Sequence, residues 1–192
     1  MTGDPVATFD AWFAEARAAG LALPEAMTLA TATPDGAPSA RIVLMKDHDA
    51  DGFVWFTDRR SRKGRELAAN PRAALVFQWD PLRRQVRAEG AVVPIDDEAS
   101  WAYYRTRPRG SQIGAWASHQ SAVIPSRAEL EAEVAAVEAR FAGADPPLPP
   151  HWGGYRLTPD VYEFWTHDHA RLHDRQVYRR TADGWAHELL SP

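Results

Sequence analysis

Short runs of β-branched, aromatic and aliphatic residues, each ended by a turn signal, are the feature that most constrains the fold of this chain. The runs MTLATAT and ARIVLMK, between residues 26 and 46, are separated by Pro34-Asp35-Gly36, a sequence typical of a hairpin. A third run, FVWFT at residues 53–57, follows Asp51-Gly52. We therefore predict that these three runs form an antiparallel meander.

The same pattern continues to the C-terminus. AALVFQW at residues 73–79 and the run 84–93 lie on either side of Asp80-Pro81 and extend the sheet. YRLTP, VYEFW, RQVYRR and WAHELL follow, with Asp183-Gly184 as another hairpin turn. Roughly eight strands, mostly antiparallel, favour a closed or split β-barrel over a parallel α/β fold. The predicted class is mainly β (α+β), with flanking helices in a single domain spanning residues 1–192.

Helices are predicted where capping signals precede apolar residues at helical spacing. The predicted start signals are Asp4-Pro5, Ser61, Asp96 and Ser126. Asn70-Pro71 must end the second helix, because the residue before proline is driven out of the α region. The segment 143–150 contains four prolines and is predicted to be irregular.

The composition excludes several classes of site. The chain has no cysteine, so a disulfide framework and a thiolate nucleophile are impossible, and any redox chemistry requires a bound cofactor. A net charge of −4 gives no reason to expect nucleic-acid binding. No apolar run approaches the roughly 20 residues of a membrane-spanning helix, and the N-terminus lacks the layout of a signal peptide. We therefore expect a cytoplasmic protein with no membrane partner.

Basic residues gather in several places in this acidic chain. Ser61, Arg62 and Lys63 begin a predicted helix, where free backbone N–H groups and the helix dipole favour an anion. The segment Arg107–Gln112 combines guanidinium groups, a hydroxyl and a glycine, which is typical of a second phosphate site. Ordinary solvated surface charge is the alternative for each cluster.

Two strand segments carry further candidates. Arg41 and Lys46 are five positions apart on one predicted strand, so we expect them on opposite faces of the sheet. If the chain is extended there, Arg171, His173 and Arg175 share one face, and the histidine could carry a proton near neutral pH. Exposed strand charge is again the alternative.

A metal site is the weakest of these hypotheses. His167, Asp168 and His169 resemble a ligand set, but no fourth partner stands at ligand spacing. We therefore predict no metal.

The ordered motifs of the chain resemble those of the pyridoxamine 5′-phosphate oxidase family over nearly the whole length. The matching stretches are RIVLMK at 41–46, FT and SRK within 56–63, NPR at 70–72, RQVRAEG at 84–90, TRPRGSQIGAW at 106–116, SHQS at 118–121, WGGYR at 152–156, and EFW followed by RLHDR.

The resemblance implies a homodimeric, FMN-binding split barrel in which residues from about 150 to 192 serve dimerisation and substrate binding. The residues it implies for FMN are Arg41, Ile42, Val43, Leu44, Met45, Lys46, Phe56, Thr57, Arg62, Lys63, Gln85, Gln120, Ser121, Trp165 and Arg175. Those it implies for the substrate phosphate are Lys46, Tyr103, Arg107 and Ser111. Arg171 and His173 would be the catalytic residues beside the reacting carbon.

The implied reaction oxidises pyridoxamine or pyridoxine 5′-phosphate to pyridoxal 5′-phosphate and reduces dioxygen to hydrogen peroxide. Three departures from the family pattern concern the substrate side. The chain begins almost directly at the first helix, Thr-His-Asp-His-Ala at 166–170 lacks the usual glycines, and Leu189 stands where an arginine is frequent.

Two alternatives keep the same fold. The first is a related FMN-dependent oxidase acting on another substrate, such as a dihydrophenazine carboxylic acid. Retention of Lys46, Tyr103, Arg107 and Ser111 favours a phosphorylated substrate over that one. The second is a non-catalytic flavin- or haem-binding split barrel, which would have no use for Arg171 and His173.

Overall fold

The computed structural model describes residues 3–192, so the first two residues of the predicted domain lie outside the described range. Within that range nine strands form one sheet, in which every pairing is antiparallel. The strands are β1 (Ala26–Ala32), β2 (Pro38–Leu44), β3 (Asp47–Asp49), β4 (Gly52–Asp58), β5 (Arg72–Trp79), β6 (Arg84–Pro94), β7 (Trp152–Thr166), β8 (Asp174–Thr181) and β9 (Gly184–Leu189). The mainly β, split-barrel prediction is confirmed.

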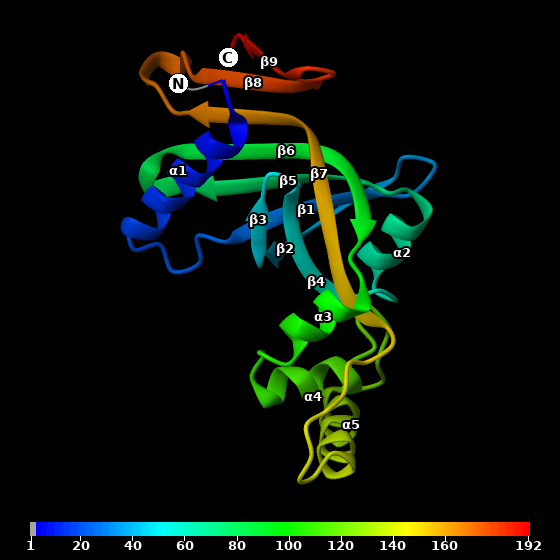
Figure 1. Cartoon of the computed structure of the whole chain (residues 1–192). Coiled ribbons are helices and arrows are strands. Elements are labelled where there is room, and N and C mark those ends of the chain that lie inside the picture. The colour runs from blue at the N-terminus through cyan, green and yellow to red at the C-terminus, as the bar shows by residue number, and fades with distance from the viewer. Residues whose placement is uncertain (1–2) are drawn as a thin grey trace.

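The strand order is β2-β1-β5-β6-β7-β4-β3, and β8 and β9 extend the sheet from the far part of β7 (Figure 1). The strand β7 pairs with β4 over its first residues and with β8 over its last ones. It therefore connects two distant parts of the molecule.

The predicted meander is wrong in its third strand. The hairpin β1–β2 forms around the expected turn, but β4 pairs with β3 and β7 and not with β2. The short strand β3, which the sequence pattern did not reveal, turns the chain into β4. Met45 and Lys46 follow β2, and the backbone N–H of Lys46 donates to Val54 of β4 at 2.8 Å. This contact joins the β1–β2 hairpin to the other edge of the sheet.

YRLTP and VYEFW belong to a single strand. Pro159 lies inside β7, where the register against β6 shifts between Glu89 and Gly90. A Cβ at Gly90 would lie 2.0 Å from the carbonyl oxygen of Thr158, so the close approach at this bulge requires glycine. The bulge therefore lets the strand bend without ending.

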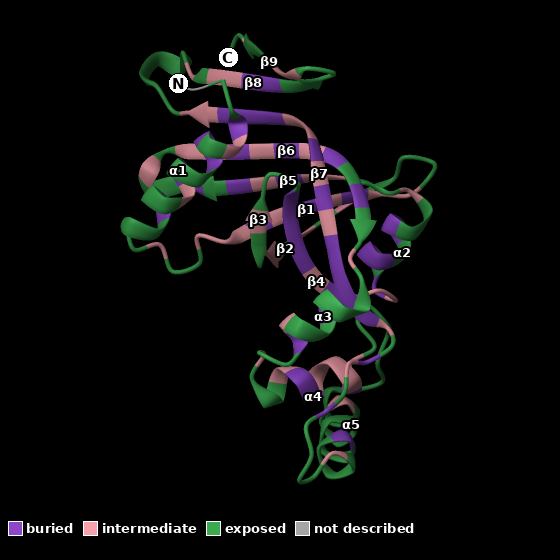
Figure 2. Cartoon of the chain, in the orientation of Figure 1, coloured by how far each residue is buried: buried purple, intermediate pink, exposed green. Residues whose placement is uncertain are grey.

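Five α-helices accompany the sheet in the described residues. They are α1 (Pro5–Ala18), α2 (Arg62–Ala69), α3 (Asp97–Tyr104), α4 (Arg109–Ala117) and α5 (Arg127–Arg140), with short 3-10 turns η1 (Asp80–Leu82) and η2 (His169–Arg171). In each of the four predicted helices, a backbone N–H of the first turn donates to the side chain of the predicted cap: Asp4, Ser61, Asp96 and Ser126. The helices α3, α4 and α5 lie together below the sheet, and α5 is largely exposed (Figures 1 and 2).

The sequence pattern did not predict α4, whose first residues belong to the segment expected to bind a second phosphate. Pro108 precedes this helix without a side-chain cap, and two of its nine residues are glycines, which lowers its intrinsic helix propensity. The helix is held by packing, since Ile113 and Ala117 are buried against Val137 of α5.

The helix α1 contributes to the main hydrophobic core. Phe9 is fully buried, with its ring 4.9 Å from that of Phe53 and 5.1 Å from that of Phe77. Burial of a phenylalanine contributes roughly 2–3 kcal/mol. No helix in residues 3–192 is long and apolar enough to cross a membrane.

His48 lies in this core, and its titration should affect stability. Its ring is 4.4 Å from Phe9 and 4.5 Å from Phe53; Nδ1 is 3.1 Å from an Asp10 oxygen, and Nε2 is buried without a partner in the described chain. Burial lowers the pKa of His48 from its usual 6.5, although Asp10, Asp49 and Asp47 oppose the shift.

The free energy of unfolding should therefore fall as the pH drops below about 6.5, because the unfolded state takes up the proton first. Urea titrations of wild type and His48→Phe between pH 5 and 8 test this. The variant should lose less stability on acidification than wild type, while the exposed His187→Phe should behave as wild type does. Parallel pH profiles for wild type and His48→Phe would contradict the assignment.

Candidate functional site

A cavity of about 270 Å³ lies where β2, β4, α2 and α3 meet the loop after α4. Its lining residues are Arg41, Ile42, Val43, Leu44, Lys46, Phe56, Thr57, Lys63, Tyr103, Arg107, Gln120 and Trp152. All of them except Trp152 are among the predicted site residues. The fold therefore brings segments from five separate motifs into one place.

Lys63 supplies a buried cation at the N-terminus of α2. Its Nζ donates to Gln120 Oε1 at 2.6 Å and to Thr57 Oγ1 at 3.1 Å, both neutral acceptors. Burial, with the nearby charge of Arg41, lowers the pKa of Lys63 to about 8. A partly desolvated ammonium with no carboxylate bonded to it favours an anionic ligand.

The position of α2 depends on a glycine one residue further on. A Cβ at Gly64 would lie 2.2 Å from the carbonyl oxygen of Arg59, which only glycine avoids. The Ser61 side chain accepts from the Gly64 backbone N–H at 3.2 Å. These contacts fix the first turn of the helix and with it Lys63.

Three aromatic rings form a stacked wall. The Phe56 ring lies 4.1 Å from the Tyr103 ring and 5.3 Å from the Trp152 ring. The planes of Phe56 and Trp152 are only 10° apart. Gly154 pairs with Phe56 across the β4–β7 ladder, and a Cβ there would come within 2.8 Å of the Phe56 ring. A flat apolar surface beside cationic groups suits an aromatic ligand that carries an anion.

Arg107 is the second cationic position. Its guanidinium lies 4.8 Å from the Trp152 ring, and its Nη1 is buried without a hydrogen-bond partner among residues 3–192. Burial lowers the pKa of Arg107 from its usual value. The side chain also lines an adjoining cavity of about 230 Å³ together with Ser111 and Gln120. A buried guanidinium nitrogen without a partner is costly unless an anion binds there.

The expected separation of Arg41 and Lys46 is wrong. The strand β2 ends at Leu44, so Lys46 lies beyond it, and both side chains line the same cavity. Met45, also predicted at the cofactor, is buried in the core at 6% exposure. Ser121 has a φ of 70° and lines a separate pocket of about 380 Å³ beside α5, together with Gln120.

Two residues that sequence reasoning did not select take part in this site. Trp152 provides one ring of the wall, and Glu66 is buried beneath Arg41 and Arg62. Glu66 stands four positions after Arg62 in a helix, the spacing at which an ion pair forms, and this signal could have indicated it. Arg62 itself is 57% exposed and is not among the residues that line the cavity.

The remaining predicted residues form a second cluster elsewhere. Gln85, Trp165 and Arg175 are cross-strand neighbours on β6, β7 and β8. The His173 ring is 4.7 Å from Trp165, and its Nδ1 accepts from the Asp168 backbone N–H at 3.2 Å. Hydrogen bonding to Glu163 raises the pKa of Arg175, whose Nε lies 2.8 Å from a Glu163 oxygen.

The expected common face of Arg171, His173 and Arg175 is not formed, because the chain is not extended there. Ala170 and Arg171 have φ values of 56° and 63°, and β8 begins only at Asp174. Positive φ values interrupt the alternation of side chains that the prediction required.

One chain does not bring the two clusters together. Trp152 begins β7, and Trp165 stands near its end, so roughly 40 Å of strand separates them at about 3.3 Å per residue. Figure 1 shows the two ends of β7 at opposite ends of the sheet. Among residues 3–192, no group of three or more histidine, aspartate and glutamate side chains is arranged to hold a metal ion.

Comparisons with known families and proteins agree along the whole chain. Residues 13–141 match the family model described as pyridoxamine 5′-phosphate oxidase. Residues 152–192 match the model described as the pyridoxine 5′-phosphate oxidase C-terminal dimerisation region.

Three relatives illustrate the similarity, each named pyridoxine/pyridoxamine 5′-phosphate oxidase. The protein of Sphingopyxis alaskensis is 56% identical over 192 residues, covering 100% of this chain and 89% of its own length. That of Burkholderia lata is 58% identical, covering 98% and 89%. That of Rubrobacter xylanophilus is 54% identical over 189 residues, covering 98% and 87%.

Two solved structures share the fold. PhzG from Burkholderia lata 383, in complex with tetrahydrophenazine-1-carboxylic acid, has a TM-score of 0.93 at 34% identity, covering 99% of this chain and 93% of its own. A pyridoxamine 5′-phosphate oxidase-related, FMN binding protein from Nostoc punctiforme has a TM-score of 0.77 at 20% identity, covering both chains fully. The matched models and the identity to the three relatives establish that the chain belongs to the pyridoxamine 5′-phosphate oxidase family.

Proposed function

We propose that this protein is an FMN-dependent oxidase that converts pyridoxamine or pyridoxine 5′-phosphate to pyridoxal 5′-phosphate and reduces dioxygen to hydrogen peroxide. The observation that carries the proposal is a pair of cationic side chains in the cavity beside the aromatic wall: Lys63, and Arg107, whose Nη1 has no partner in residues 3–192 and which also lines the adjoining cavity. A phosphorylated cofactor and a phosphorylated substrate together require two such positions. The names of the relatives support the same reading.

The residues of the cavity have the chemistry that FMN needs. Arg41, Arg62 and Lys63 would hold its phosphate, and the flat space beside Phe56 and Thr57 would take its rings. FMN would supply the redox chemistry: it would take a hydride from the substrate carbon and pass two electrons to dioxygen, and the second proton of hydrogen peroxide would come from the substrate hydroxyl or amine through solvent. With the amine substrate, water would then release ammonia to leave the aldehyde. The protein itself contributes binding, orientation and exclusion of water.

Substrate binding falls to the other cationic position. Arg107, Ser111, Lys46 and Tyr103 surround the two adjoining cavities and would hold the substrate phosphate. The buried guanidinium of Arg107 would gain the charge-assisted hydrogen bonds that the chain alone does not give it.

A homodimer would complete the site. We propose that residues from about 150 to 192 carry the dimer contact, so that Arg171 and His173 of one subunit reach the cavity of the other. The separation of the two clusters along β7 supports this arrangement, because no single chain unites them. Gln85, Trp165 and Arg175 would then close the flavin site from the partner.

The test combines a spectrum with turnover. Purified protein should show flavin absorbance and consume oxygen with pyridoxamine 5′-phosphate and pyridoxine 5′-phosphate. A colourless protein that does not take up added FMN would refute the proposal.

A second candidate activity follows from the fold comparison. PhzG is similar to this chain over 99% of its length and binds tetrahydrophenazine-1-carboxylic acid. Its 34% identity is lower than the 54–58% of the oxidases named above. Oxygen consumption with a dihydrophenazine carboxylic acid and none with the vitamin phosphates would favour this alternative.

The pKa of Lys63 makes FMN affinity dependent on pH. A bound phosphate stabilises the protonated ammonium, so above pH 8 binding must take up a proton, and the Kd should rise by up to about tenfold per pH unit. Fluorescence titration between pH 7 and 10 measures it. Lys63→Arg, which stays charged, should remove the rise. A wild-type Kd that is constant from pH 7 to 10 would contradict the role of Lys63.

A further inference from the structure

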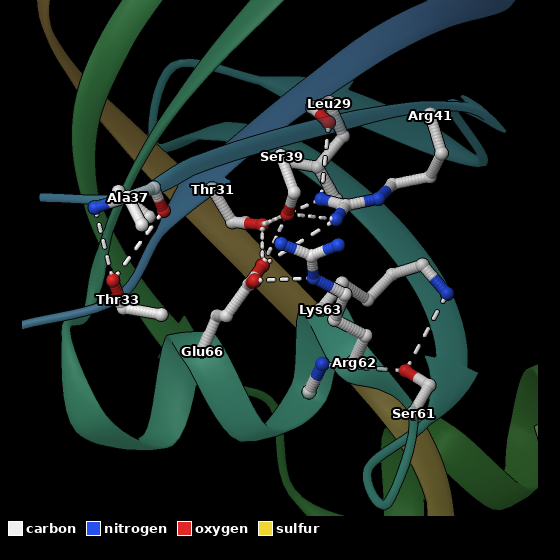
Figure 3. A network of polar contacts seen from close by, with 12 residues as sticks. Leu29, Thr31, Thr33, Ala37, Ser39, Arg41, Ser61, Arg62, Lys63 and Glu66 are labelled. Carbon is white, nitrogen blue, oxygen red and sulfur yellow. Dashed lines mark hydrogen bonds and ion pairs between the residues drawn. The ribbon is translucent and has the colours of Figure 1, made fainter. Parts of the chain in front are cut away.

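Glu66 is a buried carboxylate in the middle of a cationic site. It projects from α2 toward β1 and β2, and its side chain is only 5% exposed (Figure 3). Its Oε2 accepts from Thr31 Oγ1 at 2.5 Å and Ser39 Oγ at 2.6 Å, and Oε1 accepts from Arg62 Nε at 2.8 Å. Both oxygens of the carboxylate therefore accept hydrogen bonds, from residues of β1, β2 and α2.

The charge of Glu66 persists over the whole physiological range. Burial alone would raise its pKa, but hydrogen bonds from Ser39, Thr31 and Arg62 outweigh it and lower the pKa to about 2. An anion so placed offsets the repulsion among Arg41, Arg62 and Lys63, which lie close together without a bound phosphate.

The two arginines beside the Glu66 carboxylate differ in how many of their nitrogens are hydrogen-bonded. Both Nη atoms of Arg41 are engaged: Nη1 donates to Leu29 O and Thr31 Oγ1, and Nη2 to Ser39 Oγ at 2.5 Å and Glu66 Oε2 at 3.4 Å. Arg62 is bonded to the described chain through Nε alone. Its two terminal nitrogens are left for a ligand, at a position that the Nε contact holds.

We propose that Glu66 is a positioning residue for the flavin phosphate: it holds the guanidinium of Arg62, from α2, with its two terminal nitrogens left for a phosphate dianion, and fixes Arg41, from β2, beside it as a second positive charge. The inference rests on the proposed function, since it assumes FMN in this cavity. It concerns the phosphate end only. Glu66 lines neither of the two cavities proposed for the flavin and the substrate.

Glu66→Gln tests the proposal because it keeps the size of the side chain and removes its charge. The readout is the ratio of Kd for riboflavin to Kd for FMN, measured on apoprotein by fluorescence quenching. Riboflavin lacks the phosphate, so the ratio isolates the phosphate contribution. We expect Glu66→Gln to lower it at least tenfold, through loss of charge-assisted hydrogen bonds that orient both guanidinium groups.

The matched control is Glu131→Gln, which removes the acid of another i,i+4 ion pair, that of Arg127 and Glu131 on the exposed helix α5. It should leave the ratio unchanged. Ser39→Ala provides a milder second variant, because it removes one donor to Glu66 and one acceptor for Arg41 while leaving both charges in place. Its ratio should lie between those of wild type and Glu66→Gln.

Each other outcome overturns the inference. A higher ratio in Glu66→Gln would mean that the carboxylate only repels the phosphate, and equal weakening of both flavins would mean a purely structural role. If Glu66→Gln does not fold, an unchanged ratio in Ser39→Ala overturns it. A wild-type protein that binds both flavins equally, or neither, would instead refute the phosphate site of the proposed function.

Discussion

Replacing Arg107 with alanine is expected to raise the KM for pyridoxamine 5′-phosphate about 100-fold, with little change in bound flavin. Removing one partner of a buried, hydrogen-bonded charge pair costs roughly 2–5 kcal/mol, and each 1.4 kcal/mol is a factor of ten. Nη1 of Arg107 has no partner in the described chain, so the substrate phosphate would be its main acceptor. Steady-state oxygen consumption measures the effect.

Arg105→Ala is the matched control. Arg105 is exposed at the end of α3, two positions away, and should leave the KM within about twofold of wild type, as surface substitutions usually do. The KM of Arg107→Lys should lie between those of wild type and Arg107→Ala, because an ammonium group keeps the positive charge but loses the paired hydrogen-bond donors of a guanidinium. An Arg107→Ala enzyme with wild-type KM would place the substrate phosphate elsewhere.

At a substrate concentration near the wild-type KM, where each variant alone is nearly inactive, mixed dimers of Arg107→Ala and Arg171→Ala should recover about a quarter of the wild-type activity. If each site combines the cavity of one subunit with Arg171 and His173 of the other, a mixed dimer has one intact site and one doubly altered site. Random pairing makes about half of the dimers mixed. The measurement is the rate after the two inactive proteins are unfolded together and refolded.

Arg107→Ala mixed with Lys46→Ala is the control for this experiment. Both side chains line the same cavity of one chain, so every site in that mixture keeps one defect and no activity should return. Absence of recovery in the first mixture would show that the two clusters do not share a site across subunits. Equal recovery in both mixtures would contradict the grouping of Lys46 with Arg107.

Local signals were reliable where the physics is local. A helix cap or a two-residue turn satisfies backbone groups within a few positions, so Ser61, Ser126 and Asp183-Gly184 could be interpreted without knowledge of the rest of the chain. The helix α4 could not be predicted from the local sequence, because its glycines weaken the helical pattern and its stability comes from packing against α5. The meander failed because the partner of β4 is β7, about a hundred positions further along the chain.

The sequence by itself determined the chemistry of this protein: antiparallel strands, the caps of its helices, the absence of cysteine, and a set of arginines and lysines able to bind phosphate. Only the tertiary structure decided which of these cations act together. It put Arg41 and Lys46 in one cavity, buried Met45 in the core, left Nη1 of Arg107 without a partner in residues 3–192 and placed Glu66 beneath two arginines. The physical reason is that a side chain's type sets what it can bind, whereas its neighbours follow from strand pairings between residues far apart in sequence.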